Sequence, residues 1–183
     1  MDCTRCNTKS CRETESCSAQ KFGNEAILDT YSLPATQKVI QAAAILVNHG
    51  RAGTLSRLQE IIEFSKEMKF QRIGLAYCYG MENDAALVTT IIRESGFHMI
   101  PVSCTTGGFK QSKVNNHSNI EKVSCNPLAQ AAQINHEKVD LTITMGLCLG
   151  HDMLFQKQID SYTTTLIVKD RVHDHEPIEA LKN

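Results

Sequence analysis

The chain has 183 residues, a length typical of one domain. Its 19 Lys and Arg residues nearly balance its 20 Asp and Glu residues, so it has no general attraction for nucleic acids or anionic membranes. Only 5% of the residues are aromatic, which disfavours platforms for base stacking. The longest apolar run, Ala42 to Val47, is far shorter than the roughly 20 residues of a membrane-spanning helix. We therefore expect neither a nucleic-acid partner nor a membrane segment.

The unusual number in the composition is eight cysteines. Residues 1–18 are polar, hold four of these cysteines and lack the apolar stretch of a secretory signal, which favours a reducing, cytoplasmic compartment. Clustered cysteines in that compartment are more often metal ligands or redox groups than structural disulfides. We interpret residues 1–20 as a cysteine-rich metal-binding arm and residues 21–183 as a single α/β domain.

Two helices are expected to follow the arm and to flank the rest of the domain. The first covers residues 35–49, because Pro34 precedes it and Gly50 follows it. The second covers residues 56–69, where apolar residues recur at helical spacing. Ser56 and Gln59 at its start resemble a capping box.

Strands and helices alternate from residue 71 onward. The expected strands cover residues 72–77, 97–103, 139–145 and 163–169. The helices between them are expected to be capped by Asn83, by Asn126 (followed by Pro127) and by Asp152, and residues 106–124 are expected to form a long loop. This alternation predicts a three-layer, Rossmann-like α/β fold with a mainly parallel sheet of about four strands.

Cysteines occur where such a sheet binds its ligands, beyond the carboxyl ends of the strands. Cys78, Cys104 and Cys148 follow the first three expected strands, and Cys125 directly precedes the helix that Asn126 caps. We expect these four cysteines to meet at one edge of the sheet and to bind a metal cofactor, with His151 as a supporting or replacement ligand. The alternative is that they are buried free thiols that act as small apolar residues.

The arm has its own cysteine pattern, Cys3-x2-Cys6-x4-Cys11-x5-Cys17. Two thiolates spaced C-x2-C can reach one metal from a tight turn. Four thiolates suit tetrahedral zinc or an iron–sulfur cluster, and the compact C-x2-C-x4-C run favours a bulky cluster over a single ion. Zinc and free redox thiols remain alternatives for this arm.

Several segments together resemble one known family. They are the cysteine arm, CNPLAQA at 125–131, GLCLGHD at 146–152, and VKDRV at 168–172, which contains Lys169 and Arg171 and is followed by His175-x-Pro177. The family consists of small uncharacterised, cysteine-rich, predicted metal-binding proteins of anaerobic microbes, and the resemblance covers nearly the whole chain. It implies metal binding through the cysteines and supplies no reaction.

Other functions fit the same residues. Gly146-x-Cys148-x-Gly150 has the spacing of a nucleophile elbow with cysteine in place of serine. A hydrolase triad needs an acid and then a histidine after the nucleophile, and the chain offers Asp152, Asp170 or Asp174 as the acid and His173 or His175 as the histidine. The expected sheet is small for a hydrolase of this class. Two further alternatives are a non-redox iron–sulfur enzyme with an open iron and a zinc-binding sensor or carrier.

We expect an iron–sulfur protein with a [4Fe–4S] cluster in the arm and room for a second cluster at the sheet edge. It would transfer electrons to a redox partner protein or perform redox chemistry on a small-molecule substrate. The candidate catalytic residues at the sheet edge are Cys148, His151, Lys169 and Arg171. Lys169 and Arg171 could bind an anion or neutralise the charge of a cluster. The oligomeric state is left open.

Overall fold

The computed structural model describes residues 2–13, 15–17 and 20–182. The chain divides into two compact units, Met1–Gln41 and Ala42–Asn183. The predicted arm falls inside the first unit, and its residues 1, 14, 18 and 19 lie outside the described part.

The first unit contains short elements without a core of their own. It holds two 3-10 turns, η1 (Cys3–Arg5) and η2 (Ser10–Arg12), the helix α1 (Asn24–Tyr31) and most of α2 (Pro34–Ile45). No residue of η1, η2 or α1 is buried. The sequence interpretation missed α1, a helix of eight residues that has no side-chain cap.

The first predicted helix extends too far. The helix α2 begins at Pro34 and ends at Ile45, and a separate turn, η3 (Asn48–Gly50), follows. His49 has a φ of 56°, a left-handed conformation that no helix interior accepts. By contrast, α3 (Arg57–Met68) begins at the predicted capping box of Ser56 and Gln59.

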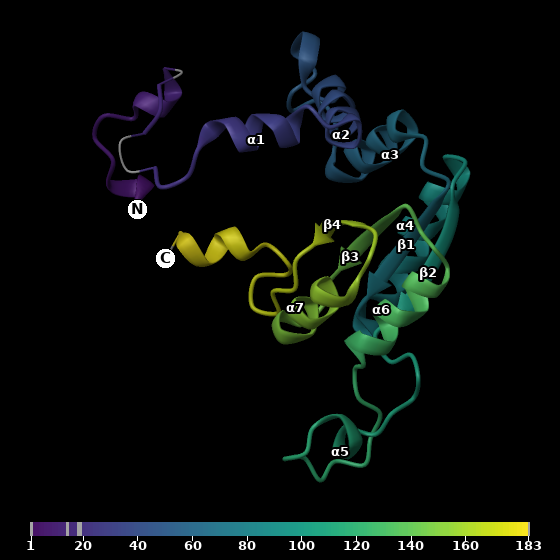
Figure 1. Cartoon of the computed structure of the whole chain (residues 1–183). Helices are drawn as coiled ribbons and strands as arrows, with labels where there is room; N and C mark the ends of the chain where they lie inside the picture. Colours follow the sequence, from purple (N-terminus) through teal and green to yellow (C-terminus); the bar gives the residue numbers. More distant parts are fainter. Residues whose placement is uncertain (1, 14, 18–19, 183) are drawn as a thin grey trace. The chain divides into compact units, whose positions relative to one another are not determined.

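The second unit is built on a sheet of four parallel strands (Figure 1). The strands are β1 (Arg72–Tyr77), β2 (His98–Ser103), β3 (Leu141–Met145) and β4 (Tyr162–Ile167), in the order β2-β1-β3-β4. The predicted Rossmann-like fold with its parallel sheet is therefore confirmed. The central strand β3 is buried along its whole length, as expected for a parallel sheet covered by helices.

Three helices pack on or beside the sheet. Both α4 (Glu82–Glu94) and α6 (Pro127–His136) contact β1 and β2, and α7 (Leu149–Gln158) packs against α6. Small residues on β1 allow α6 to approach closely, because a Cβ atom added at Gly74 would lie 2.8 Å from Ile134 Cγ2. The resulting core joins Ala76, Ile134 and Phe155 to Cys78 and Cys104 at the end of the sheet.

Of the three caps predicted for the helices between the strands, one is confirmed and two are wrong. Asn126 accepts a hydrogen bond from the Ala129 amide at 3.1 Å, with Pro127 in the first helical position. The helix α4 begins at Glu82, so Asn83 lies inside it. Cys148 rather than Asp152 is the N-cap residue of α7, because the chain turns at Gly146 and enters the helix earlier than predicted.

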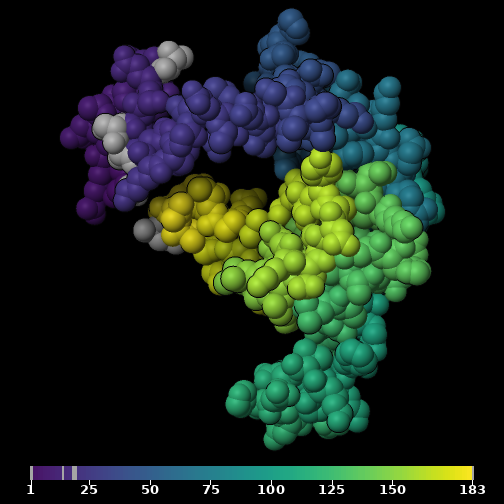
Figure 2. All heavy atoms as spheres, in the orientation of Figure 1, coloured from purple at the N-terminus to yellow at the C-terminus, as the bar shows by residue number. Residues whose placement is uncertain are grey.

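The predicted loop between β2 and α6 contains one short helix, α5 (Gln111–Val114), and an isolated antiparallel bridge between Lys110 and Val123. Figure 2 shows this segment as a lobe that projects from the second unit. Two further 3-10 turns, η4 (Tyr79–Met81) and η5 (Pro177–Leu181), complete the described elements. In the part of the chain that the structure describes, no helix has the length and apolar character needed to cross a membrane.

Candidate functional site

The topology places a switch point between β1 and β3. The chain leaves β1 through α4 to reach β2 on one side, and then passes through α6 to β3 on the other side of β1. Connections to neighbouring strands thus run in opposite directions from this point, and open α/β sheets bind ligands beyond the strand ends at such a switch. Cys78 directly follows β1 and Cys148 lies just beyond β3.

Cys78 is buried and faces a cation. Its side chain is 5% exposed, and Lys169, just beyond β4, donates a hydrogen bond from Nζ to Cys78 Sγ at 3.0 Å. Burial raises the pKa of the Cys78 thiol, but hydrogen bonds from Lys169 and the Gly80 amide and the charge of Lys169 outweigh it, so the pKa is lowered overall. The geometry therefore favours a Cys78 thiolate paired with an ammonium group.

Cys104 and Cys125 form a pair of sulfur atoms. Their Sγ atoms lie 3.4 Å apart, and the Asn126 amide donates to the Cys104 carbonyl at 2.6 Å, which joins the two loops. Burial, together with the nearby Cys125 and Cys78, raises the pKa of Cys104 to about 12, although the Tyr79 amide donates to Cys104 Sγ. Cys104 therefore keeps its proton under conditions in which Cys78 loses its own.

Cys148 lies at the amino end of α7 and also contacts a cation. Arg171 Nη2 donates to Cys148 Sγ at 3.2 Å, and this contact is the largest cause of a raised pKa for Arg171. Cys148 is the N-cap residue of α7, but its side chain makes no capping hydrogen bond. Lys169 and Arg171, singled out in the sequence for this edge, thus each donate to a different cysteine.

Three of the four sheet-edge cysteines contact one another, and the fourth, Cys148, contacts Arg171. Cys104 contacts Cys125, and Cys78 also hydrogen-bonds with Cys104. His151 lies in the first turn of α7 and has no hydrogen bond to these cysteines in the described part of the chain. Among the described residues, no group of three or more His, Cys, Asp or Glu side chains is already arranged around one metal position. The metal-binding role of these cysteines stays a prediction.

Three of the arm cysteines, Cys3, Cys6 and Cys11, lie in or next to the turns η1 and η2. The Cys6 amide donates to the Cys3 carbonyl at 3.4 Å, which closes the predicted C-x2-C turn. The Lys9 amide donates to Cys6 Sγ at 3.4 Å and Thr8 lies close to the same sulfur, so the pKa of Cys6 is lowered. All eight cysteines, Cys11 and Cys17 included, are free thiols.

The histidines proposed for a hydrolase triad point to other partners. His173 Nδ1 lies 3.1 Å from Asp170 Oδ2, and the Asp170 amide donates to His175 Nδ1 at 3.2 Å. Between the described histidines and Cys148 there is no hydrogen bond.

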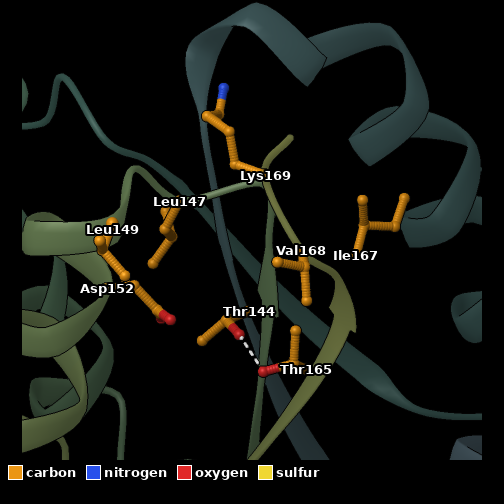
Figure 3. A pocket seen from close by; sticks show the side chains of 8 residues that line it. All are labelled: Thr144, Leu147, Leu149, Asp152, Thr165, Ile167, Val168 and Lys169. Atoms are coloured by element: carbon orange, nitrogen blue, oxygen red, sulfur yellow. Dashed lines mark hydrogen bonds between the residues drawn. The ribbon is translucent and has the colours of Figure 1, made fainter. Parts of the chain in front are cut away.

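Sequence reasoning missed a small pocket beside the cysteines (Figure 3). Its volume is about 90 Å³, and its lining consists of Thr144, Leu147, Leu149, Asp152, Thr165, Ile167, Val168 and Lys169. Asp152 was interpreted as a helix cap, but its carboxylate lines the pocket and its Oδ1 atom is buried without a hydrogen-bond partner. The available signal was its position four residues after Cys148, one helical turn along the same face.

The fold and this edge define a class of protein: a Rossmann-like α/β protein with a cysteine-rich ligand edge. The chain belongs to the family described as "Protein of unknown function (DUF1847)", which matches residues 14–166. It is also 37% identical to "Uncharacterized protein MJ0455" of Methanocaldococcus jannaschii over 186 residues, covering 99% of this chain and 93% of the relative. No solved structure gives a significant match. The predicted resemblance to an uncharacterised, cysteine-rich family is confirmed.

Proposed function

We propose that the protein is an iron–sulfur protein that uses its sheet-edge cysteines in electron transfer or redox chemistry on a small molecule. The observation that carries the proposal is the 3.4 Å contact between Cys104 and Cys125, made beyond the carboxyl end of β2, which neighbours β1 in the sheet. Cys78 and Cys148 flank the switch point at the ends of β1 and β3. These four residues would hold one cluster, and Cys3, Cys6, Cys11 and Cys17 would hold another in the arm.

The donor set fits this kind of group. All the candidate ligands are thiols, and soft thiolate donors select iron–sulfur clusters or zinc over oxygen-preferring metals. Metal binding by thiols is commonly coupled to the final ordering of the ligands, which is compatible with a structure in which Cys104 contacts Cys125 while no described group of three ligands surrounds one metal position. When bound, an iron–sulfur cluster supplies one-electron transfer at a potential that neighbouring charges adjust.

The surrounding charges support an anionic group at this edge. Four thiolates in one place repel each other, and cations within hydrogen-bond distance reduce that repulsion. Lys169 donates to Cys78 at 3.0 Å and Arg171 donates to Cys148 at 3.2 Å. Both cations come from the segment that follows β4, so a single loop delivers the compensating charge to two strand ends.

The test is a metal analysis of the full chain purified without oxygen. We expect about four or eight irons with matching acid-labile sulfide per chain, and a broad visible absorption band that dithionite bleaches. A Cys104→Ser variant is expected to lose the sheet-edge iron, whereas Ser118→Ala, in the loop that leads to Cys125, is expected to keep it. Zinc without iron would instead support the zinc alternative, and the absence of both metals would overturn the proposal.

A further inference from the structure

The pocket beside the cysteines has a polar floor and apolar walls. Its hydroxyl groups come from Thr144 on β3 and Thr165 on β4, and its apolar side chains include Leu147, Ile167 and Val168 (Figure 3). Its volume of about 90 Å³ exceeds the space that a single water needs, which is about 10–15 Å³ on the same measure. The pocket therefore has room for a molecule of several non-hydrogen atoms.

Asp152 gives the pocket a group that lacks a partner. Its Oδ1 atom is buried and has no hydrogen-bond partner in the described part of the chain. Leaving a charged or polar atom buried without a hydrogen bond is unfavourable, so native proteins retain such atoms where a ligand, ion or water satisfies them. Figure 3 shows the Asp152 carboxylate pointing toward the side of the pocket on which Thr144 lies.

Within the residues that the structure describes, Lys169, the cation in the pocket lining, forms no ion pair with this carboxylate. Lys169 also lines the pocket, but its ammonium group donates to Cys78 Sγ at 3.0 Å. Among the described residues, no ion pair joins Lys169 to Asp152. The negative charge of Asp152 is thus left for a positively charged ligand.

The two threonines add a further recognition element. Thr144 Oγ1 donates to Thr165 Oγ1 at 3.0 Å, which uses one lone pair of the Thr165 oxygen and leaves the second to accept a hydrogen bond from a ligand. Thr144 is only 2% exposed, which fixes this pair as part of the floor rather than as a surface contact. A ligand with a donor for Asp152 and a short apolar body would match both the floor and the walls.

We propose that this pocket binds a short-chain primary alkylammonium, with its ammonium group on Asp152 and its alkyl chain against the apolar walls. The proposal goes beyond the iron–sulfur function, because the binding contacts come from Asp152, the threonines and the apolar walls and need no metal. Leu147 lies next to Cys148, and Lys169 contacts Cys78, so a ligand here would lie beside the cysteine edge. The site thereby assigns a chemical class to the small molecule that the protein recognises.

The proposal can be tested by calorimetric titration of the full chain, purified without oxygen, with n-propylammonium chloride. We expect saturable one-site binding, and no binding of n-propanol or propionate under the same conditions. Asp152→Asn is expected to weaken binding about tenfold or more, because a charge-assisted hydrogen bond is lost. Asp160→Asn, at an exposed aspartate outside the pocket, is the matched control and should bind like the unchanged protein.

Two results would overturn the proposal: no saturable binding of n-propylammonium, or binding that Asp152→Asn leaves unchanged. Equal affinity for n-propanol would also overturn it, since charge would then play no part. Should Asp152→Asn fail to fold, Thr165→Val provides a second test and is expected to weaken binding without removing it. Iron counts on the same samples separate the two proposals, because binding without iron would support the pocket and overturn only the cluster.

Discussion

Two neighbouring cysteines show how the contact partner decides whether burial keeps a thiol protonated. Cys78 and Cys104 are both buried, at 5% and 3% exposure. Burial raises the pKa of each thiol, but at Cys78 hydrogen bonds from Lys169 and the Gly80 amide outweigh it and lower the pKa, whereas at Cys104 burial dominates and, with the nearby thiols, raises the pKa to about 12. Pairs of titratable groups whose environments separate their pKa values are typical of reactive sites. The two shifts therefore favour the thiolate form at Cys78 and the protonated form at Cys104.

A single carboxylate orders the segment that carries the two cations. Asp170 lies between Lys169 and Arg171, and its carboxylate accepts hydrogen bonds from the Val172 and His173 amides at 2.8 and 3.0 Å. The bond from the His173 amide is the largest cause of the lowered pKa of Asp170, followed by those from the Val172 amide and the His173 side chain. Since the folded-state pKa lies below the ordinary value of 3.8, ionised Asp170 stabilises the folded protein.

The lowered pKa of Asp170 predicts how acid affects the stability of an Asp170→Asn variant. The stabilisation is fully present above the unfolded-state pKa and is lost as the pH falls through the lower folded-state pKa. We expect Asp170→Asn to unfold at a lower urea concentration than the unchanged protein at pH 6, and the difference to shrink below pH of about 3.8. A gap that stays constant from pH 6 to pH 3 would contradict this assignment.

The turn between β3 and α7 is the element that positions Cys148. Gly146 has a φ of 62°, and a Cβ atom added there would lie 2.1 Å from the Met81 sulfur in η4. Glycine is therefore required twice, once by the backbone conformation and once by the packing of Met81. The turn fixes where α7 begins, which is why Cys148 takes the N-cap position at the sheet edge.

A Gly146→Ala substitution is expected to destabilise the protein by about 1–3 kcal/mol, through left-handed strain and displacement of Met81. Gly150→Ala is the matched control, because nothing lies within 4 Å of its added Cβ and alanine favours the helix. Urea unfolding of both variants measures the difference. The double variant Met81→Ala/Gly146→Ala should lose less stability than the sum of the losses measured in the two single variants. Strict additivity would show that Met81 is not what crowds Gly146.

The sequence predicts helices and strands well where residues close together in the chain determine them. The strand over 72–77 and the caps at Ser56 and Asn126 agree with the structure because a short apolar run and a side-chain cap are local signals. Asn83 and Asp152 were wrong caps, because turns set by distant packing, such as that of Met81 on Gly146, begin those helices earlier. The cysteine edge was predictable from the fold, but the pocket around Asp152 was not, since it combines side chains from β3, α7 and β4.

The two proposed metal sites belong to different units of the chain, the arm cysteines to the first and the sheet-edge cysteines to the second. The sheet-edge cysteines belong to the second unit and its core, whereas the described residues of η1, η2 and α1 include no buried side chain. Removing the arm thiols should therefore change metal content without changing the stability of the sheet. This separation allows the two proposed clusters to be tested independently.

A variant with Cys3, Cys6, Cys11 and Cys17 all replaced by serine is expected to lose about half of the bound iron, since one of two [4Fe–4S] clusters would be absent. Its urea unfolding, followed by far-ultraviolet circular dichroism, should differ from that of the unchanged protein by less than about 0.5 kcal/mol, as for other exposed substitutions. Unchanged iron would contradict a metal role for the arm. Complete loss of iron would instead show that arm and sheet-edge cysteines share one centre, because independent clusters cannot both depend on the arm.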